Sequence, residues 1–122
     1  MKKLIRNTYI FGMANLVPPK TGLPVSIWIE HAGITRNVSH SNIPRVKIGF
    51  QGGASVSVLI SENPEILTTT ARIKKSDMRD IEEGIKYIAR NHDLFLKCYM
   101  NTDYSFGDDE LKDALRERGE YK

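Results

Sequence analysis

Residues 43–60 read IPRVKIGFQGGASVSVLI, and this stretch decides the fold. Apolar side chains alternate with polar or small ones on both sides of the glycine pair Gly52-Gly53. Alternation with a period of two around a glycine turn predicts a β-hairpin, with the glycines explained by the turn. One face then carries Val46, Ile48, Phe50, Val56, Val58 and Ile60, and the other carries Arg45, Lys47, Gly49, Ser55, Ser57 and Leu59. We expect the first face to line the core.

The flanking sequence predicts further strands in residues 1–70. Candidate strands lie around Leu4–Phe11, Val25–His31 and Glu65–Thr70. They are separated by breaks rich in proline and glycine, and the segments 17–20, 21–24 and 61–64 are expected to be extended or to turn. Residues 32–42 are polar and predict a loop, a natural place for function.

In residues 76–118 the spacing of the apolar residues changes from the period of a strand to that of a helix. Apolar residues at spacings of three and four predict an amphipathic helix over residues 77–90, with N-cap residues and an early acid in Lys75-Ser76-Asp77. A bend is expected at residues 91–93, then an apolar stripe to about Asn101, and a short helix from Asp108. Residues from Gly119 onward are expected to fray. Strands followed by helices predict an α+β fold, in which three to five antiparallel strands pack beneath the helices.

Length and composition indicate a single domain, residues 1–122, of ordinary globular composition. Cys98 is the only cysteine, which excludes an internal disulfide and a multi-cysteine zinc site and favours a cytoplasmic location. No apolar run is long enough to span a membrane, so we expect no membrane partner.

The charge is unevenly distributed along the chain. Residues 1–60 carry seven Lys and Arg residues and one acid, Glu30, whereas residues 61–122 carry eleven bases and fourteen acids. A basic strand-rich half is suited to an anionic partner. A solvated surface that keeps the protein soluble explains the same distribution, and the sequence leaves both explanations open.

The hairpin face opposite the core is the main site candidate. We call it the polar face, and it comprises Arg45, Lys47, Ser55 and Ser57, with Ser26 and Trp28 from the preceding strand. Cations beside hydroxyls can hold phosphate, and an indole can stack on a base. Arg36 and His40 are expected to reach this face from the 32–42 loop. An ordinary solvated sheet face would carry the same types of residue, so that alternative also remains.

The other groups of residues that could form a functional site have simpler, structural explanations. Gly52-Gly53 lacks the Lys-Ser/Thr pair and the following helix of a phosphate-binding loop. His31, His40 and His92 are too scattered to predict a metal site, and we expect no cofactor. Cys98 lies on an apolar helix stripe, as a small buried residue does. The acids from Asp108 to Glu110 suit the start of a helix.

Several short motifs carry a resemblance to a known family. They are Thr21–Pro24 before Ile27-Trp28-Ile29, then Pro44–Ile48, then Val56–Ile60, and finally Ile81–Leu96 with Ile88-Ala89-Arg90-Asn91-His92-Asp93-Leu94. The chain resembles short, uncharacterised bacterial and phage-borne domains of the Pro-Pro-His-Phe-His type. That family is linked to toxin–antitoxin and mobile-element neighbourhoods. Arg45 and Lys47 stand where many members carry histidines, so the resemblance implies an accessory protein rather than a reaction.

Three functions follow as hypotheses. The first is a non-enzymatic binding protein of phage or mobile-element type that recognises a nucleotide or nucleic acid through the polar face. The second is an inhibitor or toxin–antitoxin accessory that binds a host or toxin protein through apolar anchors such as Trp28 or Tyr104. The third is a small enzyme, which would need a deep pocket with a titratable pair. A homodimer is also open, because an exposed edge strand can be protected by pairing.

Overall fold

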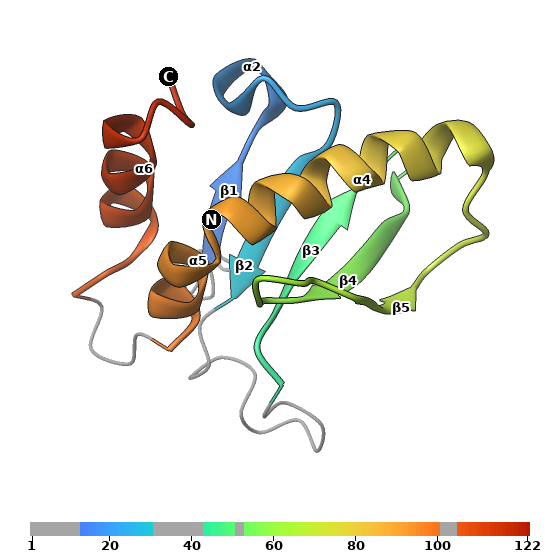
Figure 1. Cartoon of the computed structure of the whole chain (residues 1–122), viewed down its shortest axis with the longest axis horizontal. Coiled ribbons are helices and arrows are strands. Elements are labelled where there is room, and N and C mark those ends of the chain that lie inside the picture. Colours follow the sequence, from blue (N-terminus) through green and yellow to red (C-terminus); the bar gives the residue numbers. More distant parts are fainter. Residues whose placement is uncertain (1–12, 31–42, 51–52, 101–104) are drawn as a thin grey trace, which may run out of the picture.

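The computed structural model describes residues 13–30, 43–50, 53–100 and 105–122. In these residues a single antiparallel sheet forms one layer and the helices of the C-terminal half form a second layer (Figure 1). This is the predicted α+β fold. The strand expected at residues 4–11 and the loop expected at residues 32–42 lie outside the described residues.

Five strands form the sheet, in the order β1-β2-β3-β4-β5. They are β1 (Met13–Leu16), β2 (Ser26–Glu30), β3 (Arg45–Gly49), β4 (Ser55–Leu59) and β5 (Ile66–Thr69). The predicted hairpin is β3 and β4, in which Val46 lies opposite Val58 and Ile48 opposite Val56. Val25, Ile27 and Ile29 are all buried, so the side of the β2 segment opposite Ser26 and Trp28 lines the core.

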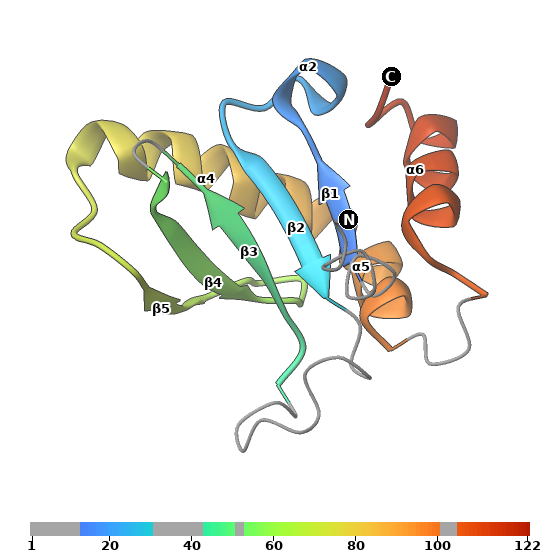
Figure 2. The ribbon, with the colours of Figure 1, turned by 180° about the vertical axis from the view of Figure 1, so that it is seen from behind.

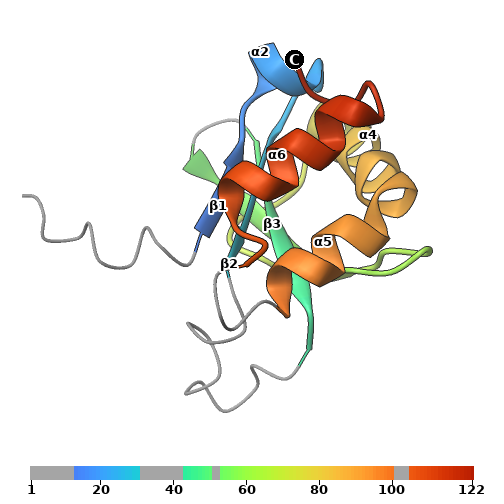
Figure 3. The ribbon, with the colours of Figure 1, turned by 90° about the vertical axis from the view of Figure 1, so that its left-hand side faces the viewer.

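Three longer helices cover the apolar side of the sheet. They are α4 (Lys75–Arg90), α5 (His92–Tyr99) and α6 (Asp108–Glu117). Figure 3 shows α4 and α5 on one side of the sheet and α6 along its β1 edge. The α4 helix crosses the sheet closely at Gly84, where an added β-carbon would lie 3.0 Å from Cγ2 of Val25 and 3.1 Å from Cδ1 of Ile48. The glycine thus permits close packing of this helix on the sheet, at a small cost in helix propensity.

The segment around the two prolines is helical, whereas the sequence predicted an extended segment or a turn. The single-turn helix α2 (Pro18–Thr21) has proline at its first two positions and ends at Gly22, whose φ is 82°. Proline suits the first turn because the N–H groups there have no helical partner, and its φ matches the helix. Glycine readily takes the left-handed conformation that ends the turn.

The start of α4 also differs from the prediction. Its N-cap residue is Lys74, which makes no side-chain capping bond, so Ser76 and Asp77 lie inside the first turn. Asp77 is the early acid expected there, in a position favoured by the helix dipole. The cap prediction was wrong because short polar side chains favour a cap only if the backbone leaves the helix at that residue.

The C-terminal residues are ordered, and the prediction that they fray was wrong. Tyr121 is only 7% exposed, and its ring lies beneath the guanidinium of Arg116, 5.2 Å from the ring centroid. The N–H of Lys122 donates to the carbonyl oxygen of Lys20 at 2.9 Å, which ties the end of the chain to α2. Contacts with distant parts of the chain therefore outweigh the polar character of this segment.

A polar network joins the C-terminal residues to the junction between α4 and α5. Asn91 is buried, and its side-chain N–H groups donate to the Tyr87 carbonyl at 3.0 Å and to Glu120 Oε2 at 3.1 Å. Its side-chain oxygen accepts from Arg118 Nη1 at 3.2 Å. The carboxylate of Glu120 also accepts from Arg90 Nε at 2.9 Å. Because the buried amide is fully paired, it holds three segments together without an unsatisfied group.

Candidate ligand-binding face

The polar face lies on the side of the sheet away from the helices, and no described helix covers it (Figure 2). The strand register aligns three of its residues, Trp28, Lys47 and Ser57, with Asn15 and Thr68 in one row across all five strands. Asn15 lies opposite Trp28, Trp28 opposite Lys47, Lys47 opposite Ser57, and Ser57 opposite Thr68. Neighbouring strands are about 4.8 Å apart, so the side chains of adjacent members can bind one ligand together.

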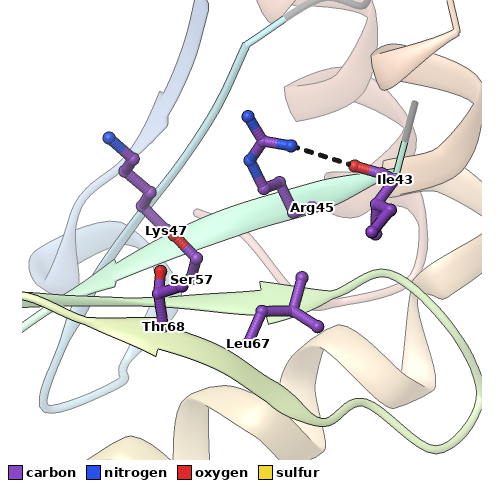
Figure 4. A pocket seen from close by; sticks show the side chains of 6 residues that line it. All are labelled: Ile43, Arg45, Lys47, Ser57, Leu67 and Thr68. Carbon is purple, nitrogen blue, oxygen red and sulfur yellow. Dashed lines mark hydrogen bonds between the residues drawn. The ribbon is translucent and has the colours of Figure 1, made fainter. Parts of the chain in front are cut away.

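A pocket of about 520 Å³ lies on this face above β3, β4 and β5. Its lining consists of Ile43, Arg45, Lys47, Ser57, Leu67 and Thr68. Figure 4 shows the Ser57 and Thr68 side chains next to each other at one end and the Ile43 and Leu67 side chains at the other. The pocket thus has a hydroxyl-bearing end near Lys47 and an apolar end, toward which the Arg45 guanidinium points.

The indole of Trp28 is positioned by a glycine on the adjacent strand. A β-carbon added to Gly49 would lie 2.7 Å from Cζ3 of Trp28 and 3.1 Å from its Cη2. The six-membered ring therefore occupies the space that any other side chain at position 49 would fill. Trp28 remains partly exposed, so part of the indole is available to a ligand.

The polar groups in the row have few internal partners. The side chains of Lys47, Ser57 and Thr68 make no hydrogen bond or ion pair with one another or with any other described residue. Arg45 is held in place by its own chain, since Nη1 donates to the Ile43 carbonyl oxygen at 3.4 Å. An ammonium and two hydroxyls that are not used internally can be used by an anion.

The structure separates the predicted site residues into three groups. Trp28, Lys47 and Ser57 share the row, and Arg45 lines the same pocket. Ser55 is only 9% exposed and lies opposite Gly49, so it is withdrawn from the surface. Arg36 and His40 lie outside the described residues.

Three pocket residues were missed by sequence reasoning. Thr68 could have been placed by extending the hairpin register to the next strand, because Ser57 and Thr68 lie opposite each other. Leu67 could not have been placed in this way. The pairing of β4 with β5 shifts register between Ser57 and Val58, and this irregularity breaks the alternation of side chains between the two faces of the sheet. Ile43 precedes the strand, and its position depends on how the chain enters β3.

The remaining candidates have structural roles. Cys98 is 1% exposed, and burial raises the pKa of its thiol to about 12, which disfavours the reactive thiolate. His92 Nδ1 lies 2.9 Å from the carbonyl oxygen of Ala89, at the end of α4. Glu110 accepts from the Gly107 N–H at 2.8 Å and so caps α6, as expected of this acidic run.

Two kinds of structural feature are absent from the described residues. They hold no cluster of three or more histidine, cysteine or acidic side chains that could bind a metal ion. None of the helices in this part of the chain has both the length and the apolar character needed to cross a membrane.

Comparison of the chain with protein-family models, with curated proteins and with solved structures found no match.

Proposed function

We propose that this protein is a small binding module that recognises a nucleotide or single-stranded nucleic acid on its polar face. The observation that carries the proposal is the row in which an indole, an ammonium and two hydroxyls stand on adjacent strands, on a sheet face that no described helix covers. In this proposal Trp28 stacks on a base, Lys47 and Arg45 contact phosphate, and Ser57 and Thr68 donate to phosphate or sugar oxygens.

The electrostatics of the pocket support an anionic ligand. The described lining residues include two cations and two hydroxyls but no carboxylate, imidazole or thiol. Such a lining attracts phosphate and supplies donors to it, whereas acid–base catalysis needs a titratable pair within reach of the substrate. The geometry therefore supports binding better than the small-enzyme hypothesis.

One observation supports a second candidate, a protein partner. Ile43 is 45% exposed and Leu67 is 38% exposed, and both lie at the apolar end of the pocket. An inhibitor or toxin–antitoxin accessory could use them with Trp28 as apolar anchors. The resemblance to mobile-element domains suits both candidates, since each is a cytoplasmic accessory role.

The protein contains its own reporter for the test. Trp28 is the only tryptophan, so its fluorescence reports on the polar face alone. We expect titration with an oligothymidylate of about ten nucleotides to quench this fluorescence, as base stacking on an indole does. For two phosphate contacts, log K should fall by about 1.4 per tenfold rise in salt concentration.

A charge-reversed variant identifies the surface. The double variant Arg45→Glu, Lys47→Glu should lose at least about tenfold in affinity, since it replaces two attractive charges by repulsive ones. The matched control is Lys86→Glu on α4, whose side chain is 67% exposed, and it should bind as the parent protein does. Equal binding by the parent and the double variant, with both folded, would refute the proposal. Binding of a protein instead, with little salt dependence, would favour the second candidate.

A further inference from the structure

A second apolar surface lies on the polar side of the sheet, apart from Trp28. Ile43 and Leu67 are two of the four large apolar side chains that are exposed among the described residues, and both line the apolar end of the pocket (Figure 4). The other two, Leu96 and Met100, belong to α5 and to the residue that follows it. The pocket therefore combines polar groups that suit a phosphate with apolar groups that a phosphate cannot use.

An irregularity in the sheet gives Leu67 this position. Ser57 lies opposite Thr68, and the next residue of β4, Val58, lies opposite Ile66. Leu67 is therefore an extra residue between two paired ones, as in a β-bulge. Strict alternation would turn the neighbour of Thr68 toward the core, whereas a bulge re-aims a side chain and is common next to functional sites. The bulge thus brings an aliphatic side chain into the pocket.

Lys47 lies between the two apolar surfaces. Trp28 is opposite Lys47 on one side, and Ser57 is opposite Lys47 on the other. The row then continues to Thr68, the residue next to Leu67. With about 4.8 Å between neighbouring strands, the main chains at Trp28 and Thr68 are about 14 Å apart. An ammonium and two hydroxyls therefore occupy the centre, with an apolar surface on each side.

The Arg45 guanidinium lies at the apolar end of the pocket. Its Nη1 donates to the Ile43 carbonyl oxygen at 3.4 Å, which directs the group toward Ile43 (Figure 4). A guanidinium can contact a phosphate and can also stack on the flat face of a ring. Beside two aliphatic side chains, it suits a flat ring with polar edges, such as a nucleobase.

We propose that the unit bound is a dinucleotide step, in which two nucleosides are joined by one phosphodiester. This inference rests on the proposed function and defines its ligand more closely. One base stacks on Trp28, the phosphodiester lies at Lys47, and the second base enters the apolar end of the pocket against Leu67. A mononucleotide has a single base and would leave one of the two surfaces empty. Single strands are commonly bound with neighbouring bases splayed apart onto separate surfaces.

The test compares ligands of equal charge. One is the thymidine dinucleotide TpT, and the others keep the phosphodiester but carry an abasic sugar at one end or at the other. We expect TpT to bind at least about fivefold more tightly, which corresponds to about 1 kcal/mol for one base contact. In NMR titrations of the parent protein, TpT should shift both the Trp28 indole N–H signal and the Leu67 methyl signals. Each abasic ligand should shift only one of the two.

A leucine variant identifies the second surface. Leu67→Ala should weaken the binding of TpT by about three- to tenfold, because apolar contact with the second base is lost. It should leave unchanged the affinity for an abasic ligand whose base is on Trp28. The matched control is Leu96→Ala, since Leu96 is 37% exposed against 38% for Leu67 and lies on α5. This control should bind every ligand as the parent protein does.

The outcomes separate this inference from the proposed function. Equal affinity for TpT and the abasic ligands, or Leu67 signals that do not move with TpT, would overturn the dinucleotide inference while binding at Trp28 still stands. If neither TpT nor a thymidine decamer perturbs Trp28, the proposed function fails and the inference fails with it. Tighter binding of the decamer than of TpT would identify a single strand as the source of the step, and equal affinity would identify a free dinucleotide.

Discussion

Gly49 on β3 makes room for the indole of Trp28 on β2. A β-carbon at Gly49 would approach Cζ3 of Trp28 to 2.7 Å, a distance that β-carbons in proteins essentially never show. Trp28 lies directly opposite Lys47, so its ring reaches diagonally along β3 to the glycine. The aromatic part of the proposed site therefore depends on the absence of a side chain on the neighbouring strand.

Gly49→Ala should displace the indole and weaken binding of an oligothymidylate. Loss of one stacked base costs about 1–3 kcal/mol, which corresponds to a fall in affinity of about five- to 150-fold. The measurement is a fluorescence titration together with the emission maximum of Trp28, which should shift in the unbound variant. Gly107→Ala is the control, because its added β-carbon would meet only Glu110 Oε1, at 3.5 Å. Unchanged affinity and emission in Gly49→Ala would show that the glycine does not position the ring.

Gly84→Leu should destabilise the fold by about 1–3 kcal/mol or more, because the new side chain must displace Val25 and Ile48 beneath α4. Urea denaturation followed by circular dichroism gives the free energy of unfolding. Glu82→Leu, two residues earlier on the exposed side of the helix, should change it by less than about 0.5 kcal/mol. Equal effects of the two leucines would mean that α4 does not approach the sheet closely at Gly84.

Tyr121→Ala should lower the free energy of unfolding by about 3 kcal/mol, because it empties a buried aromatic site at the C-terminus. Lys122→Ala, one residue further, removes only an exposed side chain and should be close to neutral. Thermal and urea denaturation of both variants make the comparison. If Tyr121→Ala and Lys122→Ala had the same free energy of unfolding, residues 119–122 would be frayed in solution.

The C-terminal network predicts a loss of stability in acid. Hydrogen bonds from Arg90 and Asn91 lower the pKa of Glu120, and the hydrogen bond from Arg118 lowers the pKa of Asp93 to about 2. Since both pKa values are lower in the folded state than in the unfolded state, the unfolded state binds more protons as the pH falls. The stabilisation is therefore complete above about pH 4–5, where the unfolded carboxyls ionise, and is lost as the pH falls toward 2.

Glu120→Gln isolates this effect. The variant should be less stable than the parent by about 1–2 kcal/mol at pH 7, allowing for the partial exposure of the ion pair. The difference should shrink between about pH 5 and pH 2, because the parent carboxylate is neutralised there. Denaturation curves across this range provide the measurement, with Glu82→Gln on the exposed side of α4 as the control. A difference that does not change with pH would exclude a contribution from the Glu120 charge.

The sequence predicted the parts of the fold that depend on local periodicity. The alternation in residues 43–60 placed Val46, Ile48, Val56 and Val58 on the buried face, and all four are at most 1% exposed. Spacings of three and four residues placed the long helix within two residues of its observed start. Both succeed because a strand or helix that buries one face must repeat its apolar residues with its own geometric period.

The site was predicted only in part. The hairpin alternation identified Lys47 and Ser57, because the two residues face each other within the same local unit. It did not show that Ser55 would be buried, which accompanies its hydrogen bonds with Thr70 next to the end of β5. Nor did it show that Leu67 would line the pocket, which depends on a strand irregularity. The preference of a residue for a surface position cannot show which neighbours will cover it.

By itself, the sequence determined the hairpin of β3 and β4, the strand β2, the long helix α4 and which hairpin face is apolar, because these properties depend on residues close together in the chain. It did not predict the strand β1 or the helix α2. Only the tertiary structure decided that Asp108 closes the β1 edge, across 93 residues, and that Glu120 and Tyr121 hold the C-terminus against the helices. Such contacts form when distant segments meet, and their free energy depends on geometry that no local pattern encodes. The same applies to the row from Trp28 to Thr68, which exists because four strands pair in one register.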